Sequence, residues 1–355
     1  MSIRNIRVTK HGVQIALGLI WFLDGALQLQ HQMFTSAFAT QVIEPAIQGQ
    51  PRFVSGPMNF GVHLFLMHPA IFNSLFALTQ LGIGVLILWK RTRKWGLLLS
   101  LPWSLVVWVF GEGYGGIFSG HTLLLMGAPG AVSLYALLAL ATLPSKDQEE
   151  KKPKQKPQVA YWLAILWLVL WIGGGVYQLM PGQDSTDDLS SMIAGNVDGA
   201  PAWLASVDTH TANVIKGFGK TTKPAPTPKQ IDSGMNMTST QMMHMTSGET
   251  SPTNQGQPGY LFILLLAMLQ VGIGFGVLFG SIWRKLAVTL GIALALCFWV
   301  VGQSMGAYFT GLATDPNSGP LFVLLGLAIL GCADMDIRLS KLNTRIVDRM
   351  VGKPQ

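Results

Sequence analysis

Eight apolar stretches, each close to the length of a membrane-spanning helix, occupy most of this 355-residue chain. An α-helix needs about 20 apolar residues to cross about 30 Å of hydrocarbon. Only 12% of the residues are charged, whereas soluble domains carry about 25%. We therefore predict an all-α polytopic membrane protein with eight transmembrane helices, at about 11–30, 66–89, 95–111, 123–144, 160–180, 259–281, 286–304 and 319–334.

Basic residues indicate the orientation of these helices, because cytoplasmic loops of membrane proteins are enriched in Lys and Arg. With the N-terminus inside, 19 of the 24 Lys and Arg residues fall on the inner side. We therefore predict that the N-terminus and the C-terminus are both cytoplasmic. The net charge of +7 is then explained by the basic residues of the cytoplasmic loops. No nucleic-acid partner is expected, because no basic patch is interleaved with aromatic residues.

The second half of the chain repeats the first. The stretch 108–121 returns 191 positions later at 299–312, with its tryptophan, its first glycine and its closing glycine retained. Trp21 similarly corresponds to Trp171, 150 positions later. Each half then holds four spans, and an even number gives both copies the same orientation. We predict two parallel-repeat four-helix bundles, 1–145 and 158–355, joined by a charged cytoplasmic linker at 146–157.

The two copies differ in their ionisable residues. Asp24 lies inside a predicted span, where a carboxylate costs several kcal/mol unless it is paired or hydrated. We predict a site in the first half, with Asp24 and Glu112 as candidate catalytic residues. The candidate cofactor-binding residues are His68, His121, Glu112 and Asp24. The alternative is that these groups lie in outer water, where their residue types have changed between the two halves without functional consequence. Six ionisable positions have non-ionisable counterparts: Asp24 (Gly174), Arg52 (Ala202), His63 (Asn213), His68 (Pro258), Glu112 (Gln303) and His121 (Leu312).

Glycine-rich turns precede the fourth and eighth spans, at Gly127–Gly130 and Ser318–Pro320. A helix that begins at such a break starts below the outer surface and directs its positive end into a depression. We therefore expect an outward-facing vestibule lined by these turns.

The number of positions between corresponding residues is 150 at Trp21 and Trp171, and 190 at Gln80 and Gln270. The second half therefore contains an insertion of about 40 residues in an outer loop, at about 216–256. This segment is polar and lacks apolar periodicity, as is typical of disorder. The segment contains five methionines and a histidine within residues 235–245. Thioether sulfur favours Cu(I), and this cluster resembles the methionine motifs of extracytoplasmic copper proteins. The alternative is a chance cluster in a low-complexity segment. The predicted copper ligands are Met235, Met237, Met242, Met243, His244 and Met245.

Each half also resembles the DoxX/DoxD-like family of four-helix membrane proteins. The resemblance rests on residues 17–25 of the first helix, Leu-Gly-Leu-Ile-Trp-Phe-Leu-Asp-Gly, and on residues 81–88 of the second, Leu-Gly-Ile-Gly-Val-Leu-Ile-Leu. It implies a multi-pass protein of the prokaryotic cytoplasmic (plasma) membrane. Members of the family include the membrane subunit of a thiosulfate:quinone oxidoreductase, so the resemblance also implies quinone chemistry.

These observations lead us to predict extracytoplasmic copper handling. The Met/His-rich loop captures Cu(I), which is then taken up or delivered to a membrane copper enzyme. One alternative is a DoxD-like membrane subunit of a quinone-linked oxidoreductase. Another is a non-catalytic assembly subunit of a respiratory complex. The sequence does not decide whether the chain is an enzyme, nor its substrate, partners or oligomeric state.

Overall fold

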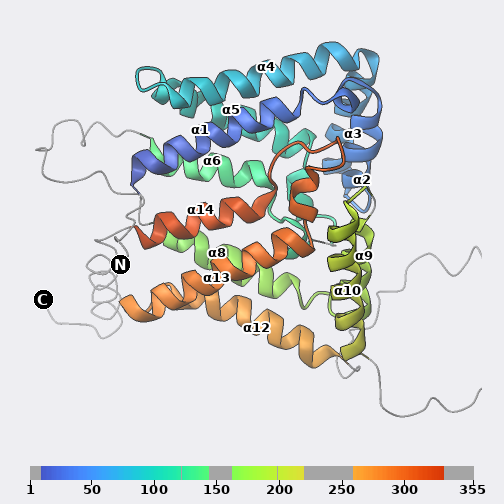
Figure 1. Cartoon of the computed structure of the whole chain (residues 1–355), viewed down its shortest axis with the longest axis vertical. Helices are drawn as coiled ribbons and strands as arrows, with labels where there is room; N and C mark the ends of the chain where they lie inside the picture. Colours follow the sequence, from blue (N-terminus) through green and yellow to red (C-terminus); the bar gives the residue numbers. More distant parts are fainter. Residues whose placement is uncertain (1–8, 121, 144–161, 198, 220–258, 332–355) are drawn as a thin grey trace, which may run out of the picture.

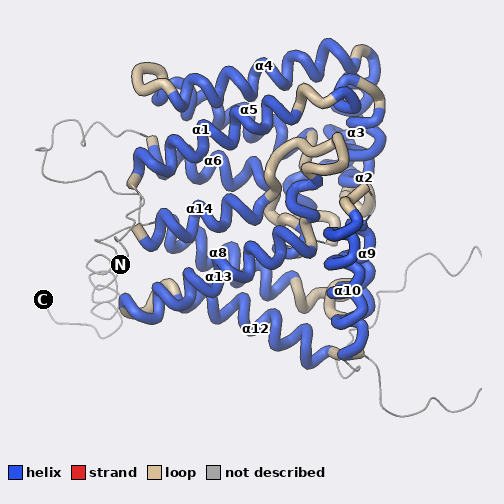
Figure 2. The backbone as a smooth tube through the Cα atoms, viewed as in Figure 1, coloured by secondary structure: helices blue, strands red, loops and turns tan. Residues whose placement is uncertain are grey.

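The structure, a computed structural model, describes residues 9–120, 122–143, 162–197, 199–219 and 259–331. Within these ranges every regular element is a helix, and no strand occurs (Figure 2). Eight long helices run side by side (Figure 1): α1 (Lys10–Leu27), α4 (Pro69–Leu88), α5 (Arg93–Phe110), α6 (Ala131–Thr142), α8 (Trp162–Tyr177), α12 (Tyr260–Gly276), α13 (Ser281–Val301) and α14 (Ser318–Leu330).

Each long helix overlaps one predicted span, and the largest difference is at the fourth. There α6 begins at Ala131 rather than near 123. The residues before it include Gly127 and Gly130, whose φ angles of 103° and 94° lie in the left-handed region. Glycine adopts this region without the steric cost that other residues meet, so the chain turns here instead of continuing the helix.

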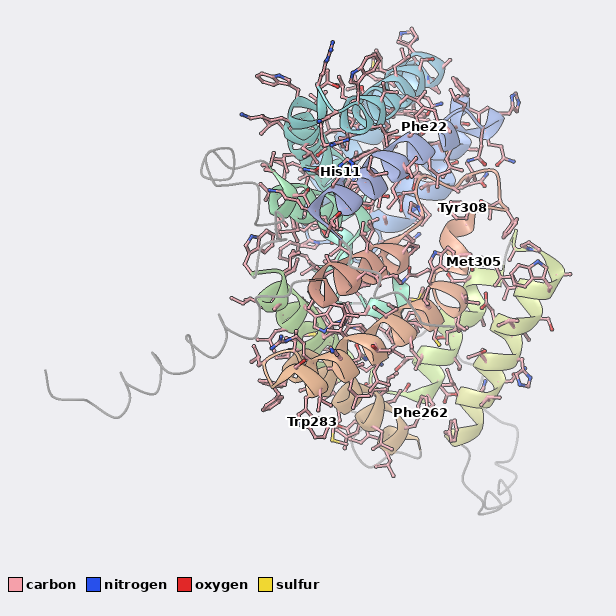
Figure 3. All side chains as sticks on the ribbon, turned by 60° about the vertical axis from the view of Figure 1, so that its left-hand side comes forward. His11, Phe22, Phe262, Trp283, Met305 and Tyr308 are labelled. Carbon is pink, nitrogen blue, oxygen red and sulfur yellow. The ribbon has the colours of Figure 1, made fainter. Side chains whose placement is uncertain are left out.

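Two of the described helices, α4 and α13, are long and apolar enough to cross a membrane. Four shorter helices, α6, α8, α12 and α14, are also apolar. Large apolar side chains project from the periphery of the bundle: Leu78 on α4 is 66% exposed, and Trp283 on α13 is 64% exposed (Figure 3). Soluble proteins rarely expose such extensive apolar surface.

Four other helices lie across one end of the bundle, which we call the capped end (Figure 1). The capped end carries α2 (Glu44–Ile47) and α3 (Arg52–Met67) from the first half, and α9 (Thr186–Ala194) and α10 (Ala202–Phe218) from the second. Five short turns of 3-10 or π-helix also lie in the connections, and a sixth, η5 (Gly195–Val197), follows α9. The five are η1 (His31–Phe34), η2 (Ala39–Ile43), η3 (Gly113–Gly116), η4 (Leu124–Met126) and η6 (Ser304–Ala307).

Equivalent positions of the two halves make equivalent contacts. A Cβ on Gly25 would lie 2.5 Å from the Leu81 nitrogen, so this glycine allows α1 to pack directly on the backbone of α4. Gly175 has the same function between α8 and α12, where a Cβ would lie 2.8 Å from the Ala267 oxygen.

The loops at the capped end interlock the two halves. From the first-half loop between α5 and α6, the Leu124 carbonyl accepts a hydrogen bond from Gln303 Nε2 of the second half (3.1 Å). From the second-half loop between α13 and α14, the Ala313 carbonyl accepts one from Gln30 Nε2 of the first half (3.1 Å). Each loop therefore packs on the half to which it does not belong.

Candidate active-site cavity

A cavity of about 170 Å³ lies at the capped end of the first half, among α1, α3, α4 and α5. A cavity of about 150 Å³ is enough to bind benzene, so this one has room for a single six-membered ring. Six aromatic side chains form most of its wall: Trp21, Phe38, Phe65, Phe76, Trp103 and Phe110. Its polar residues are Asp24, Gln28, Gln80, Glu112, Thr314 and Asp315.

The α1 helix supplies one polar stripe of the cavity wall. Trp21, Asp24 and Gln28 are spaced by three and four residues, which places them on one helix face, and each is at most 3% exposed. The Trp21 ring packs edge-on against Tyr135 of α6, with ring centroids 4.9 Å apart. The Tyr135 hydroxyl lies beside the Asp24 carboxyl, and Asp24 Oδ1 has no hydrogen-bond partner among the described residues.

Glu112 caps a helix from a distance. Its Oε1 accepts a hydrogen bond from the Val132 backbone N–H (3.3 Å), one of the donors that the start of α6 leaves unpaired. Gln303 caps α14 in the same way, because its Oε1 accepts from the Gly319 N–H (3.0 Å). Capping therefore needs only one side-chain oxygen and no charge.

Glu112 and Gln303 differ in the second polar atom of the side chain, which is Oε2 in Glu112 and Nε2 in Gln303. Gln303 Nε2 donates to Leu124, whereas Glu112 Oε2 is buried without a hydrogen-bond partner among the described residues. A Cβ at position 130 would collide with this oxygen, so Gly130 leaves the space that it occupies. Glu112, which lines the cavity, thus has one oxygen that its structural function does not require.

The surroundings of Glu112 keep its proton bound. Burial raises the pKa of Glu112 well above its ordinary value, and the negative charge of Asp315 raises it further. The backbone N–H groups of Val132 and Ala131 oppose these effects and lower the pKa. Because burial disfavours the charged form of a carboxyl, Glu112 holds its proton to a higher pH than an exposed glutamate does.

The equivalent space in the second half is closed. Leu124, which comes from the first-half loop, packs against Trp171, Phe322 and Gln303, and the gap between them has no room for a water molecule. Position 174 is glycine, and a Cβ there would collide with the Leu124 side chain. The asymmetry predicted from the sequence is therefore also an asymmetry of volume.

The structure brings some of the predicted site residues together and leaves others apart. Asp24 and Glu112 both line the cavity. His68 is exposed at the junction of α3 and α4 and is not among the cavity residues. His121 lies outside the described residues, and so do all six predicted copper ligands, residues 235–245. In the described part of the chain, no group of three or more His, Cys, Asp or Glu side chains is placed to hold a metal ion.

Asp315 is the functional residue that the sequence analysis missed. It belongs to the second half and reaches the first-half cavity because the loops interlock, so the expectation that the site is built from the first half alone was wrong. A sequence signal was present: Asp315 precedes Pro316, and Ala128 precedes Pro129, the proline that accepts the equivalent tryptophan hydrogen bond in the first half. Here the second half has the ionisable residue and the first half the apolar one.

The cavity thus combines aromatic walls with carboxyl and amide groups, a combination typical of sites for small ring compounds that form hydrogen bonds. No family model, no curated protein and no solved structure matches the chain, so its resemblance to the DoxX/DoxD-like family stays a prediction.

Proposed function

We propose that the chain is a multi-pass membrane protein whose eight long helices span the bilayer with the capped end on the outer side. Two helices of sufficient length, the exposed apolar side chains and the distribution of Lys and Arg support this arrangement. The 12 and 13 residues of α6 and α14 cover only part of the bilayer thickness. The loops before them supply the remainder, which is tolerated where such backbone is buried within protein.

Within this arrangement, we propose that the cavity binds the ring of a quinone or quinol, as the membrane subunit of a quinone-linked oxidoreductase. One observation carries the proposal: a ring-sized, aromatic-lined cavity contains two carboxyl groups, Asp24 and Glu112, each with an oxygen that has no partner among the described residues. Protonated carboxyl groups donate to the carbonyl oxygens of a quinone, and carboxylates accept from the hydroxyls of a quinol.

Conversion of a quinone into a quinol consumes two electrons and two protons. A partner redox protein supplies or removes the electrons, and Asp24 and Glu112 exchange the protons with the ring oxygens. A positioned general acid of this kind contributes about 10²–10⁴-fold to a rate.

Binding of a short-chain ubiquinone analogue to the purified protein tests this function. Trp21 and Trp103 line the cavity, so bound quinone should quench part of the tryptophan fluorescence. Glu112→Leu removes the carboxyl at similar volume, and we expect binding about tenfold weaker, close to the value of one hydrogen bond, whereas Glu112→Gln keeps a donor and should retain quinone binding.

Asp208→Asn is the matched control for this experiment. It also neutralises a buried acid, but one that is not among the cavity residues, and it should bind the quinone as the wild type does. Equal quinone affinity in the wild type and in Glu112→Leu, or no saturable quenching at all, would reject the quinone site.

Copper handling remains a second proposal, and one described contact favours it. A Cβ on Gly259 would lie 3.1 Å from the Gly219 Cα, so the segment 220–258 leaves and rejoins the fold at a single point beside the end of α10, at the capped end. A methionine-rich segment attached there supplies soft thioether ligands for Cu(I) on the side that we propose to be extracytoplasmic.

Deletion of 220–258, with Gly219 joined directly to Gly259, tests the copper proposal. Because the two ends already touch, we expect the shortened chain to fold, and its bound copper after incubation with Cu(I) to fall to background. A chain of unchanged length, with leucine at the five methionines of 235–245, should lose copper equally. Undiminished copper in both variants would exclude this segment as the binding site.

A further inference from the structure

A second cavity, which we call the vestibule, adjoins the first at the capped end. Its volume is about 560 Å³. Gln32 and Gln41 in its wall are exposed, so it opens to solvent. The vestibule and the inner cavity share three lining residues: Val42, Thr314 and Asp315.

The Asp315 carboxyl is held in the partition between the two cavities. Its Oδ2 accepts a hydrogen bond from Thr314 Oγ1 and its Oδ1 accepts one from the Asn317 N–H, each at 2.7 Å. These bonds come from its own loop, so the carboxyl has a fixed position. Asp315 is also close enough to Asp24 and Glu112 to interact electrostatically with both.

We propose that Asp315 is the proton inlet of the first-half site, which exchanges protons between water in the vestibule and the carboxyl of Glu112 in the inner cavity. The inference rests on the proposed function, because it assigns the route by which the protons of that chemistry arrive. In each transfer the Asp315 carboxyl gives its proton to the Glu112 carboxylate, and the Asp315 carboxylate then takes one from water. The second half therefore supplies a proton-transferring carboxyl to the site in the first half.

The charges around Asp315 are compatible with this relay. Burial raises the pKa of Asp315, although its two hydrogen bonds lower it. The ionisable groups that act on the site are Asp24, Glu112, Tyr135 and Tyr308, besides Asp315 itself. Among the described residues that line either cavity there is no Lys, Arg or His, so no cation fixes these carboxyl groups in their charged form.

Tyr308 belongs to the same loop as Asp315. Figure 3 places it close to Met305, in the second-half loop between the two halves. Burial and the charges of Asp24 and Asp315 raise the pKa of Tyr308. Its hydroxyl therefore stays protonated and able to donate a hydrogen bond throughout the physiological range.

Infrared spectroscopy of the ligand-free protein at about pH 5 tests the inlet without any quinone. The C=O stretch of protonated Glu112 is identified as the band that Glu112→Gln removes. Its shift after transfer to D₂O reports how fast this buried proton exchanges. We expect Asp315→Asn to slow the exchange by about tenfold or more, since a general acid contributes at least that much, and Asp315→Glu to restore it.

Asp208→Asn is again the matched control and should exchange as the wild type does. Ala313→Phe, at a residue that lines the vestibule only, is a second variant that narrows the route without changing an acid, and it should also slow exchange. Wild-type exchange in both Asp315→Asn and Ala313→Phe, or the absence of a Glu112 band, would overturn the inlet.

The same variants separate this inference from the proposed function. Asp315→Asn should bind the ubiquinone analogue within about twofold of the wild type, because Glu112 and Asp24 remain. If exchange slows but no protein binds quinone, the inlet stands and the quinone site fails. If quinone binds but exchange is insensitive to position 315, the inlet fails alone.

Discussion

Glu112 and Gln303 cap equivalent helices, and a single side-chain atom separates them. The sequence could predict this pair because tryptophan and glycine landmarks fix the register between the halves. It could also predict Asp24, because an acid within an apolar stretch is costly without a function. It could not place His68. The exposure of a residue at a helix end depends on how α3 turns into α4, and no local pattern specifies that turn.

The buried carboxyl of Asp208 leads to a prediction about how stability depends on pH. It is completely buried on α10, its Oδ1 has no hydrogen-bond partner among the described residues, and its Oδ2 lies 3.5 Å from Ser304 Oγ. Burial raises the pKa of Asp208 to about 6. Folding therefore takes up a proton between the ordinary pKa and about 6, so stability falls as pH rises through this window and stays low above it.

Asp208→Asn should remove this pH dependence. We expect its thermal midpoint in detergent to exceed that of the wild type by about 2–4 °C at about pH 8, and the difference to vanish at about pH 4. Asp208→Met copies Met58, the counterpart 150 positions earlier, and should behave similarly. A wild-type midpoint that does not change over this pH range would show that the buried carboxyl carries no penalty.

At the scale of elements, the long helices were predictable and the lateral ones were not. Apolar stretches mark the long helices directly. By contrast, α3 contains Pro57 and is interrupted by polar residues such as Asn59 and His63, so it lacks the continuous apolar stretch by which a span is identified. Its position across the end of the bundle, where it supplies Gly61 and Phe65 to the cavity, depends on packing between distant elements.

The close contact of α1 with α4 gives a prediction at this scale. In Gly25→Ala the new methyl group meets the backbone nitrogen of Leu81, so α1 must move away and take Asp24 with it. We expect a thermal midpoint lower by several degrees, since overpacking typically costs about 1–3 kcal/mol, together with weaker quinone binding. Gly82→Ala on α4 meets nothing within 4 Å and should be neutral or slightly stabilising. Equal effects of the two substitutions would contradict the proposed close packing.

For the whole molecule, the decisive feature is the exchange of loops between the halves. Trp108 Nε1 donates to the Pro129 carbonyl across 21 positions of sequence, whereas Trp299 Nε1 donates to the Pro316 carbonyl across 17. The first-half loop is therefore four residues longer between equivalent anchors. The sequence shows this difference in length, but it cannot show that each loop crosses to the other half. That crossing puts Asp315 into one pocket and Leu124 into the other.

Leu124→Ala tests this exchange across the whole molecule. If a first-half leucine seals the second-half pocket, its truncation should cost about 2–5 kcal/mol and leave an apolar cavity beside Trp171 and Phe322. Such a cavity binds benzene or xenon, so we expect benzene to raise the thermal midpoint of this variant and not that of the wild type. Leu140→Ala, at an exposed leucine of α6, creates no cavity and controls for nonspecific effects of benzene. Quinone binding should persist in Leu124→Ala, because the first-half cavity does not include this residue. A benzene response no larger than that of Leu140→Ala would mean that Leu124 does not seal a pocket of its own, and the two halves would then differ only in their ionisable groups.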